Sequence, residues 1–224
     1  MEENRFLERF AYLCLMNSKA LNILAQVHKL YQRYGIKSVT MDDVAKHLGI
    51  SKKTLYEHFR DKQDLVRNVL MAEHDNRCGS LTAIVDQQLN AIEELFEVYK
   101  MLNTMFREYN PSMEFDLRKY YPDLFTEIKE IRRKRMFESV LNNINKGKKE
   151  GLYRKELNSK IIAKLHVFRT ESLFDNDMFT SEELTSFKMF HEVFIYHIQG
   201  ILSHEGRSFF EINFDKFKSS LSFS

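Results

Sequence analysis

The sequence predicts an all-α protein in which short helices near the N-terminus are followed by longer ones. Among its 224 residues are only 7 Gly and 2 Pro, which leaves few turn residues for a sheet of many strands. Apolar residues recur at spacings of three and four along most of the chain, the period of a helix with one buried face. The chain is long enough to bury a core without help from disulfides or metals.

Four helices are expected between residues 18 and 70. The first should span about 18–34, where Leu24, Val27 and Tyr31 keep the helical period. Each of the next three helices follows a polar residue that can cap its N-terminus. These caps are Thr40 for the second helix, Ser51 for the third and Asp61 for the fourth.

Longer helices are expected beyond residue 75. Pro122 suits the first position of a helix, because that position needs no backbone N–H donor. The sequence contains no low-complexity tract or long linker, so we expect one continuous helix near residues 70–80, shared by two domains. The expected long helices cover 81–105, Pro122 to Gly147, 158–174, and a last one capped by Thr180 or Ser181 and running to 202.

Charge is unevenly distributed along the chain. Residues 17–70 hold 10 Lys and Arg against 5 Asp and Glu, which leaves 24 against 27 elsewhere. A basic N-terminal quarter joined to a slightly acidic remainder is expected when one part meets phosphates and the other does not.

The spacing from Ala45 to Leu55 is what two crossing helices joined by a short turn require. Ala45 is small enough for close helix approach, and Gly49 accepts the positive φ of the turn. The outer face of the following helix is then left for polar contacts. Its side chains suit phosphate oxygens and the edges of bases in the major groove. They are Lys52, Lys53, Thr54, Tyr56 and His58.

The stretch VTMDDVAKHLGISKKTLYEHFRDKQDL, from Val39 to Leu65, resembles the DNA-binding domain of the tetracycline repressor (TetR) family. The shared features are the Thr that opens the second helix, the Ala and Gly of the turn, the T-L-Y-x-H-F run and the Lys-x-x-Leu that opens the fourth helix. The resemblance covers residues 18–70, and the remainder agrees only in helix number and length. It implies an N-terminal helix-turn-helix DNA-binding domain followed by a larger helical domain for ligand binding and dimerisation.

The resemblance also implies which residues meet DNA. Phosphate contacts would come from Thr40, Tyr56, His58 and Lys62, with Ser51, Lys52, Lys53 and Thr54 at or near the groove. The chain departs from the family pattern at Lys53, a position often occupied by Gly. It also departs at Glu57, which stands where an uncharged or basic residue suits phosphate better. Glu57 could instead accept a hydrogen bond from cytosine N4.

Aromatic residues of the larger domain have two interpretations. They could fill a helical core, the commoner fate of aromatics at helical spacing, or line the effector pocket that the resemblance implies. No concentrated acidic or basic set accompanies them, so any effector is expected to be largely apolar. The pocket candidates are Phe96, Tyr99, Phe106, Phe125, Phe137 and Phe168.

The expected domains are an N-terminal extension at 1–17, the helix-turn-helix domain at 18–70 and a regulatory domain at 71–224. The expected function is a cytoplasmic transcriptional regulator, a repressor that binds double-stranded operator DNA and is released by a small molecule. It would be a homodimer that pairs through its last two long helices.

The rival interpretation is a small-molecule binding protein of the same fold without DNA recognition, and Glu57 is its best support. An enzyme is not expected, because no nucleophile–base pair or glycine-rich phosphate loop is present. Neither cofactor nor metal is expected, since Cys14 and Cys78 form no thiolate site. No apolar run approaches the roughly 20 residues that span a bilayer.

Overall fold

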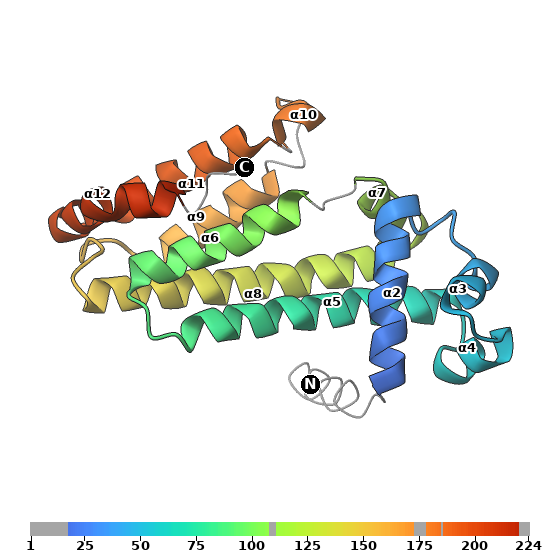
Figure 1. The fold of residues 1–224 in the computed structure, drawn as a ribbon. Helices are drawn as coiled ribbons and strands as arrows, with labels where there is room; N and C mark the ends of the chain where they lie inside the picture. Colours follow the sequence, from blue (N-terminus) through green and yellow to red (C-terminus); the bar gives the residue numbers. More distant parts are fainter. Residues whose placement is uncertain (1–17, 108–110, 173–177, 185, 220–224) are drawn as a thin grey trace. The chain divides into compact units, whose positions relative to one another are not determined.

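The computed structural model describes residues 18–107, 111–172, 178–184 and 186–219, and this part of the chain is helical without any β-strand (Figure 1). A single antiparallel bridge pairs Tyr153 with Leu202. The predicted all-α class is therefore confirmed. The helices are α2 Ser18–Tyr34, α3 Met41–Leu48, α4 Lys52–His58, α5 Lys62–Val85, α6 Ala91–Arg107, α7 Pro111–Tyr120, α8 Pro122–Lys149, α9 Ser159–Ser172, α10 Ser181–Leu184, α11 Phe187–Ile201 and α12 His204–Ser219.

The chain forms two compact units. The first combines Met1–Gly79 with Asn110–Lys129, and the second combines Ser80–Tyr109 with Glu130–Ser224. Helix α5 runs without a break from Lys62 to Val85, so the continuous helix expected through residues 70–80 is present. The first unit also contains α7, which lies far along the sequence from the helix-turn-helix.

The core of the first unit comes from the apolar faces of α2 to α5. Leu24, Val27 and Tyr31 lie one helical turn apart on α2, and all three are buried. Leu65 and Val66, in the first turn of α5, are also fully buried. This core fixes the three short helices on the start of the longer α5.

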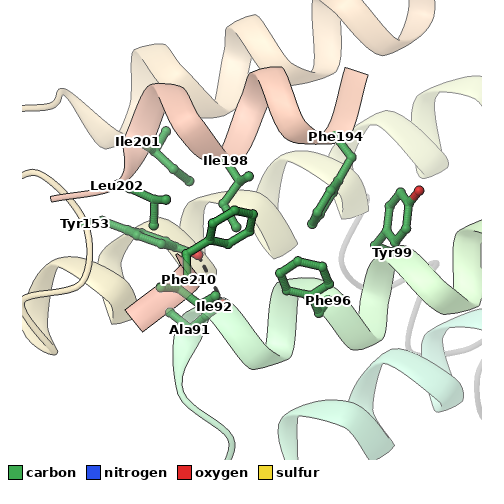
Figure 2. Packing of buried hydrophobic residues seen from close by; sticks show 10 residues of the cluster. All are labelled: Ala91, Ile92, Phe96, Tyr99, Tyr153, Phe194, Ile198, Ile201, Leu202 and Phe210. Atoms are coloured by element: carbon green, nitrogen blue, oxygen red, sulfur yellow. Dashed lines mark hydrogen bonds between the residues drawn. The ribbon is translucent and has the colours of Figure 1, made fainter. Parts of the chain in front are cut away.

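The core of the second unit is an aromatic and aliphatic cluster built on α6, α11 and α12 (Figure 2). Phe96 of α6 packs edge-to-face on Phe194 of α11, with ring centroids 4.9 Å apart. Buried Tyr153 donates a hydrogen bond to the Ala91 carbonyl at 3.1 Å. Its ring lies against Gly147, where an added Cβ would come within 2.2 Å of it. Only glycine fits that position of α8.

Two of the expected long helices are divided in the structure. The helix expected over 81–105 is broken, because the chain leaves α5 after Val85 and Gln88 adopts a φ of 55°. Asn90 then caps α6, since its Oδ1 accepts the Ile92 N–H at 3.0 Å. Apolar periodicity continued across this turn and concealed it. Helix α6 ends at Arg107, and Pro111 begins α7.

The last expected helix is also divided. Thr180 does cap a helix, because its hydroxyl accepts the Glu183 N–H at 3.2 Å, but that helix is the four-residue α10. Ser186 caps α11, and the sequence interpretation missed α12 altogether. By contrast, α8 begins at Pro122 as predicted. The helix expected over 158–174 corresponds to α9, and residues 173 and 174 lie outside the described part.

None of the helices in the described ranges is both long and apolar enough to cross a bilayer.

Candidate nucleic-acid interface

Helix α3 begins at the predicted capping box. The Thr40 hydroxyl oxygen accepts the Asp43 N–H at 3.1 Å, and the Asp43 carboxylate accepts the Thr40 N–H at 2.9 Å. The hydrogen bonds from Thr40 hold the pKa of Asp43 below its usual value. Gly49 ends the helix in the left-handed region, at a φ of 64°. Both ends of α3 are thus fixed by local chemistry.

The turn that follows orients α4. The Ile50 N–H donates to the Ala45 carbonyl at 3.0 Å, and Ser51 caps α4 by accepting the Thr54 N–H at 3.0 Å. Leu55 and Phe59 are fully buried and hold the inner side of α4 against the unit. This is the crossing-helix geometry of a helix-turn-helix.

The outer face of α4 carries most of the predicted DNA contacts. Ser51, Lys53 and Tyr56 are exposed, while Thr54 and His58 are partly buried. The Lys52 ammonium forms an ion pair with the Asp42 carboxylate of α3, which orients Lys52 across the two helices. Because both partners are half exposed, the pair adds about 0–1 kcal/mol to stability. Glu57 is exposed on the same helix.

Lys62, the remaining predicted contact, lies at the first residue of α5. Its ammonium donates to the Lys37 carbonyl at 3.2 Å. Partial burial and the nearby Lys37 lower the pKa of Lys62. An ammonium has three donors, so this hydrogen bond leaves two for a phosphate.

Helix α7 supports the loop between α2 and α3. Asp116 Oδ2 accepts the Lys37 N–H at 2.7 Å. The same oxygen would lie 2.8 Å from a Cβ added at Gly35, whose φ of 78° also favours glycine. Sequence interpretation missed Asp116, because 79 residues separate it from Lys37 and no spacing pattern links them.

The predicted pocket residues lie in different surroundings. Phe96 and Tyr99 are both buried in the cluster of the second unit, with ring centroids 6.5 Å apart. Phe137 is partly buried and Phe168 is exposed. Phe125 is partly buried in the first unit, and the side chain of Phe106 lies outside the described residues.

A largely buried polar cluster joins α9 and α11. The rings of His166 and His197 lie 4.4 Å apart between centroids, and Arg169 Nη2 lies 3.3 Å from His166 Nδ1. Burial, and then the charge of Arg169, lowers the pKa of His166 to about 4. Burial also lowers the pKa of His197 well below its usual value. Both imidazoles are therefore neutral at neutral pH.

Acid is expected to destabilise the second unit through these histidines. Because the folded-state pKa of His166 lies below the ordinary value of 6.5, the unfolded chain takes up a proton first as the pH falls. The free energy of unfolding should therefore decline between about pH 6.5 and pH 4. Urea unfolding of the whole chain across this range measures the decline, and replacing both histidines with Asn should flatten it. An unchanged slope in that variant would contradict the assignment.

Comparison with known proteins adds to this geometry. Residues 23–69 match the family described as bacterial regulatory proteins, tetR family. An HTH-type transcriptional regulator of Staphylococcus aureus (strain USA300) is 44% identical over 48 residues, which are 21% of this chain. The chain spans only 26% of that relative's length.

Solved structures resemble a larger part of the chain. A transcriptional regulator from Cytophaga hutchinsonii has a TM-score of 0.69 at 21% identity, over 84% of this chain and 100% of that one. A ketosteroid transcriptional regulator of Mycobacterium tuberculosis has a TM-score of 0.52 at 19% identity, over 84% of this chain and 97% of that one. These likenesses extend the shared fold to the second unit.

Proposed function

We propose that this chain binds operator DNA sequence-specifically and represses transcription in the cytoplasm, because its residues 23–69 match the tetR family of bacterial regulatory proteins. The observation that carries this proposal is the face of α4, where buried Leu55 and Phe59 leave Lys53 and Tyr56 exposed. A helix held in this way inserts into the major groove.

The contacts divide into two kinds. Thr40, Tyr56, His58 and Lys62 bind backbone phosphates and set the position of the protein on the duplex. Ser51, Lys52, Lys53 and Thr54 lie at or near the groove. The N-cap and first turn of α4 supply this second set, as in other helix-turn-helix proteins.

The protein acts as a homodimer through α9 and α11. Ile161, Leu165 and Phe168 form one stripe along α9, and Tyr196 of α11 adds to it; these side chains are between 54% and 76% exposed. The guanidinium of Arg169 lies 5.8 Å from the Tyr196 ring centroid, which places the two helices side by side. Exposed apolar side chains in such a stripe favour an interface in which they pack against the same stripe of a second protomer. Two-fold symmetry would then set two α4 helices about one DNA turn apart.

A small, largely apolar effector releases the operator by changing that spacing. The buried aromatic cluster around Phe96 and Tyr99 is the apolar region that would enclose it. One of the structural neighbours is a ketosteroid regulator, and its name refers to an apolar molecule. The effector needs only unequal affinity for the two arrangements of the dimer.

A binding protein of this fold without DNA recognition is the second candidate. It is favoured by Glu57, whose exposed carboxylate on α4 would repel phosphates. Under that alternative, changes to the α4 face leave any DNA affinity unaltered.

Tyr56→Phe and Lys62→Ala separate the two candidates. Each should weaken binding to operator and random duplex alike, because both residues contact phosphate, and Lys62→Ala should also reduce the salt slope by about one. Fluorescence anisotropy at several salt concentrations measures both effects.

Lys155→Ala is the matched control, since Lys155 is an exposed cation of the second unit. Thermal melting of each variant shows whether the fold is retained, which matters because Lys62 also bonds the Lys37 carbonyl. If folded Tyr56→Phe and Lys62→Ala proteins both bind DNA like Lys155→Ala, the DNA-binding proposal is wrong.

A further inference from the structure

A second exposed surface of the first unit lies beside the helix-turn-helix. It is formed where the end of α2 and the loop after it meet α7, which pack on each other through Asp116 and Gly35. Three of its side chains are aromatic and between 41% and 60% exposed. The flank surface, as we name it, consists of Arg33, Tyr34, Lys37, Phe115, Lys119 and Tyr120.

Each cation of the flank surface lies over an aromatic ring. The Arg33 guanidinium is 5.2 Å from the Tyr34 centroid, and the Lys37 ammonium is 4.6 Å from the Tyr120 centroid. Lys119 Nζ lies between two rings, 5.3 Å from Phe115 and 5.4 Å from Tyr120. A cation–π contact attracts the cation to the face of the ring and leaves its charge in place. The rings therefore hold these cations in place without neutralising their charge.

Carboxylates do not neutralise the flank surface either. Within the described ranges, no carboxylate forms an ion pair with Arg33, Lys37 or Lys119. Asp116 of α7 accepts a hydrogen bond from the backbone N–H of Lys37 and forms no ion pair with the Lys37 ammonium. Three positive charges thus remain available to an anionic partner.

The flank surface lies next to the proposed phosphate contacts of the helix-turn-helix. Lys37 precedes Thr40, the N-cap of α3, by three residues, and its carbonyl accepts the hydrogen bond from Lys62 Nζ. Thr40 and Lys62 are themselves proposed phosphate contacts. A hollow of about 520 Å³ lies in this region, lined by Tyr34, Gly35, Lys37, Ser38, Ser112, Phe115 and Asp116. Aromatic rings and hydroxyls beside cations suit a sugar–phosphate backbone.

We propose that the flank surface binds the backbone phosphates of operator DNA immediately outside the half-site that α4 contacts. The inference rests on the proposed function and extends it, because α7 then adds phosphate contacts that read no sequence. Each phosphate neutralised by a cation adds about 0.9 to the slope of log affinity against log salt. Three cations would add about 2.7 per half-site.

The test uses the full chain and two operator duplexes, one with flanking base pairs and one trimmed to the half-sites. The variant carries Arg33→Gln, Lys37→Gln and Lys119→Gln, changes that leave the Lys37 backbone bonds to Asp116 and Lys62 in place. On the long duplex, its salt slope should be lower than that of the wild-type protein by about 2.7 per half-site. On the trimmed duplex, the two proteins should bind alike. Lys155→Gln controls for loss of a cation elsewhere.

Three outcomes would overturn the inference. If the variant and the wild-type protein have equal salt slopes on the long duplex, the flank surface does not touch DNA. If the variant is weakened equally on both duplexes, the three changes act on the helix-turn-helix and not on flanking phosphates. If the wild-type protein binds neither duplex nor any genomic fragment, the proposed function fails as well.

Discussion

Phe59→Ala is expected to destabilise the first unit by about 3–5 kcal/mol, the usual cost of deleting a buried aromatic ring. The Phe59 side chain is 0% exposed, and its backbone N–H caps α4 by donating to the Leu55 carbonyl at 3.0 Å. Without the ring, the inner side of α4 would lose its packing against the rest of the first unit. DNA affinity should therefore be lost together with the stability of the unit.

Urea unfolding followed by circular dichroism measures the stability loss, and anisotropy measures DNA binding. Leu21→Ala is the matched control, because this α2 residue of the same unit is 42% exposed and its truncation should change stability by less than about 0.5 kcal/mol. Equal stability losses in the two variants would contradict the assignment of Phe59 as the anchor of α4.

Leu165→Glu combined with Phe168→Glu is expected to dissociate the homodimer. Both side chains belong to the exposed apolar stripe of α9. Burying a carboxylate against a second copy is costly, and truncating a hot-spot residue alone costs about 2 kcal/mol or more, roughly 30-fold in affinity. The separated protomers should bind a full operator far more weakly, because they lose the coupling between half-sites.

Sedimentation at micromolar concentration measures the association state. Ile212→Glu is the control, since Ile212 is an exposed aliphatic residue on α12, outside the proposed interface. If the wild-type protein sediments as a stable monomer, the homodimer proposal is wrong. If the doubly substituted protein remains a dimer, the interface lies on a face other than the α9 stripe.

The helix-turn-helix could be predicted because its determinants are local. Thr40, Gly49 and Ser51 act on backbone groups within four residues of themselves, so their spacing in the sequence reveals their roles. The burial of Leu55 follows from the same pattern. Residue type and spacing therefore suffice where each contact lies within one or two helical turns.

Contacts between distant segments could not be predicted. The pairing of Asp116 with Lys37 and the ion pair of Lys52 with Asp42 depend on how separate helices pack. The break after Val85 was concealed because apolar residues keep the helical period on both sides of it. Thr180 was correctly expected to cap a helix, but a cap does not determine how far its helix extends.

The burial of aromatic residues in the second unit could not be predicted from the sequence, for a different reason. Phe96 and Phe168 have the same side chain and both follow a helical period, yet one is buried in the cluster and the other is exposed. Periodicity identifies a helix face but not what covers it. The same pattern therefore fits a core, an effector pocket and a dimer interface.

The most direct test of the central claim is salt-dependent binding of the purified protein to a labelled fragment from upstream of its own gene, with random DNA as competitor. Fragments from elsewhere in the genome are tested in parallel. A sequence-specific regulator should bind one of these fragments saturably, resist the competitor and weaken steeply as salt rises. Absence of binding to any DNA at low salt would contradict the claim and would leave the helix-turn-helix as a structural feature only.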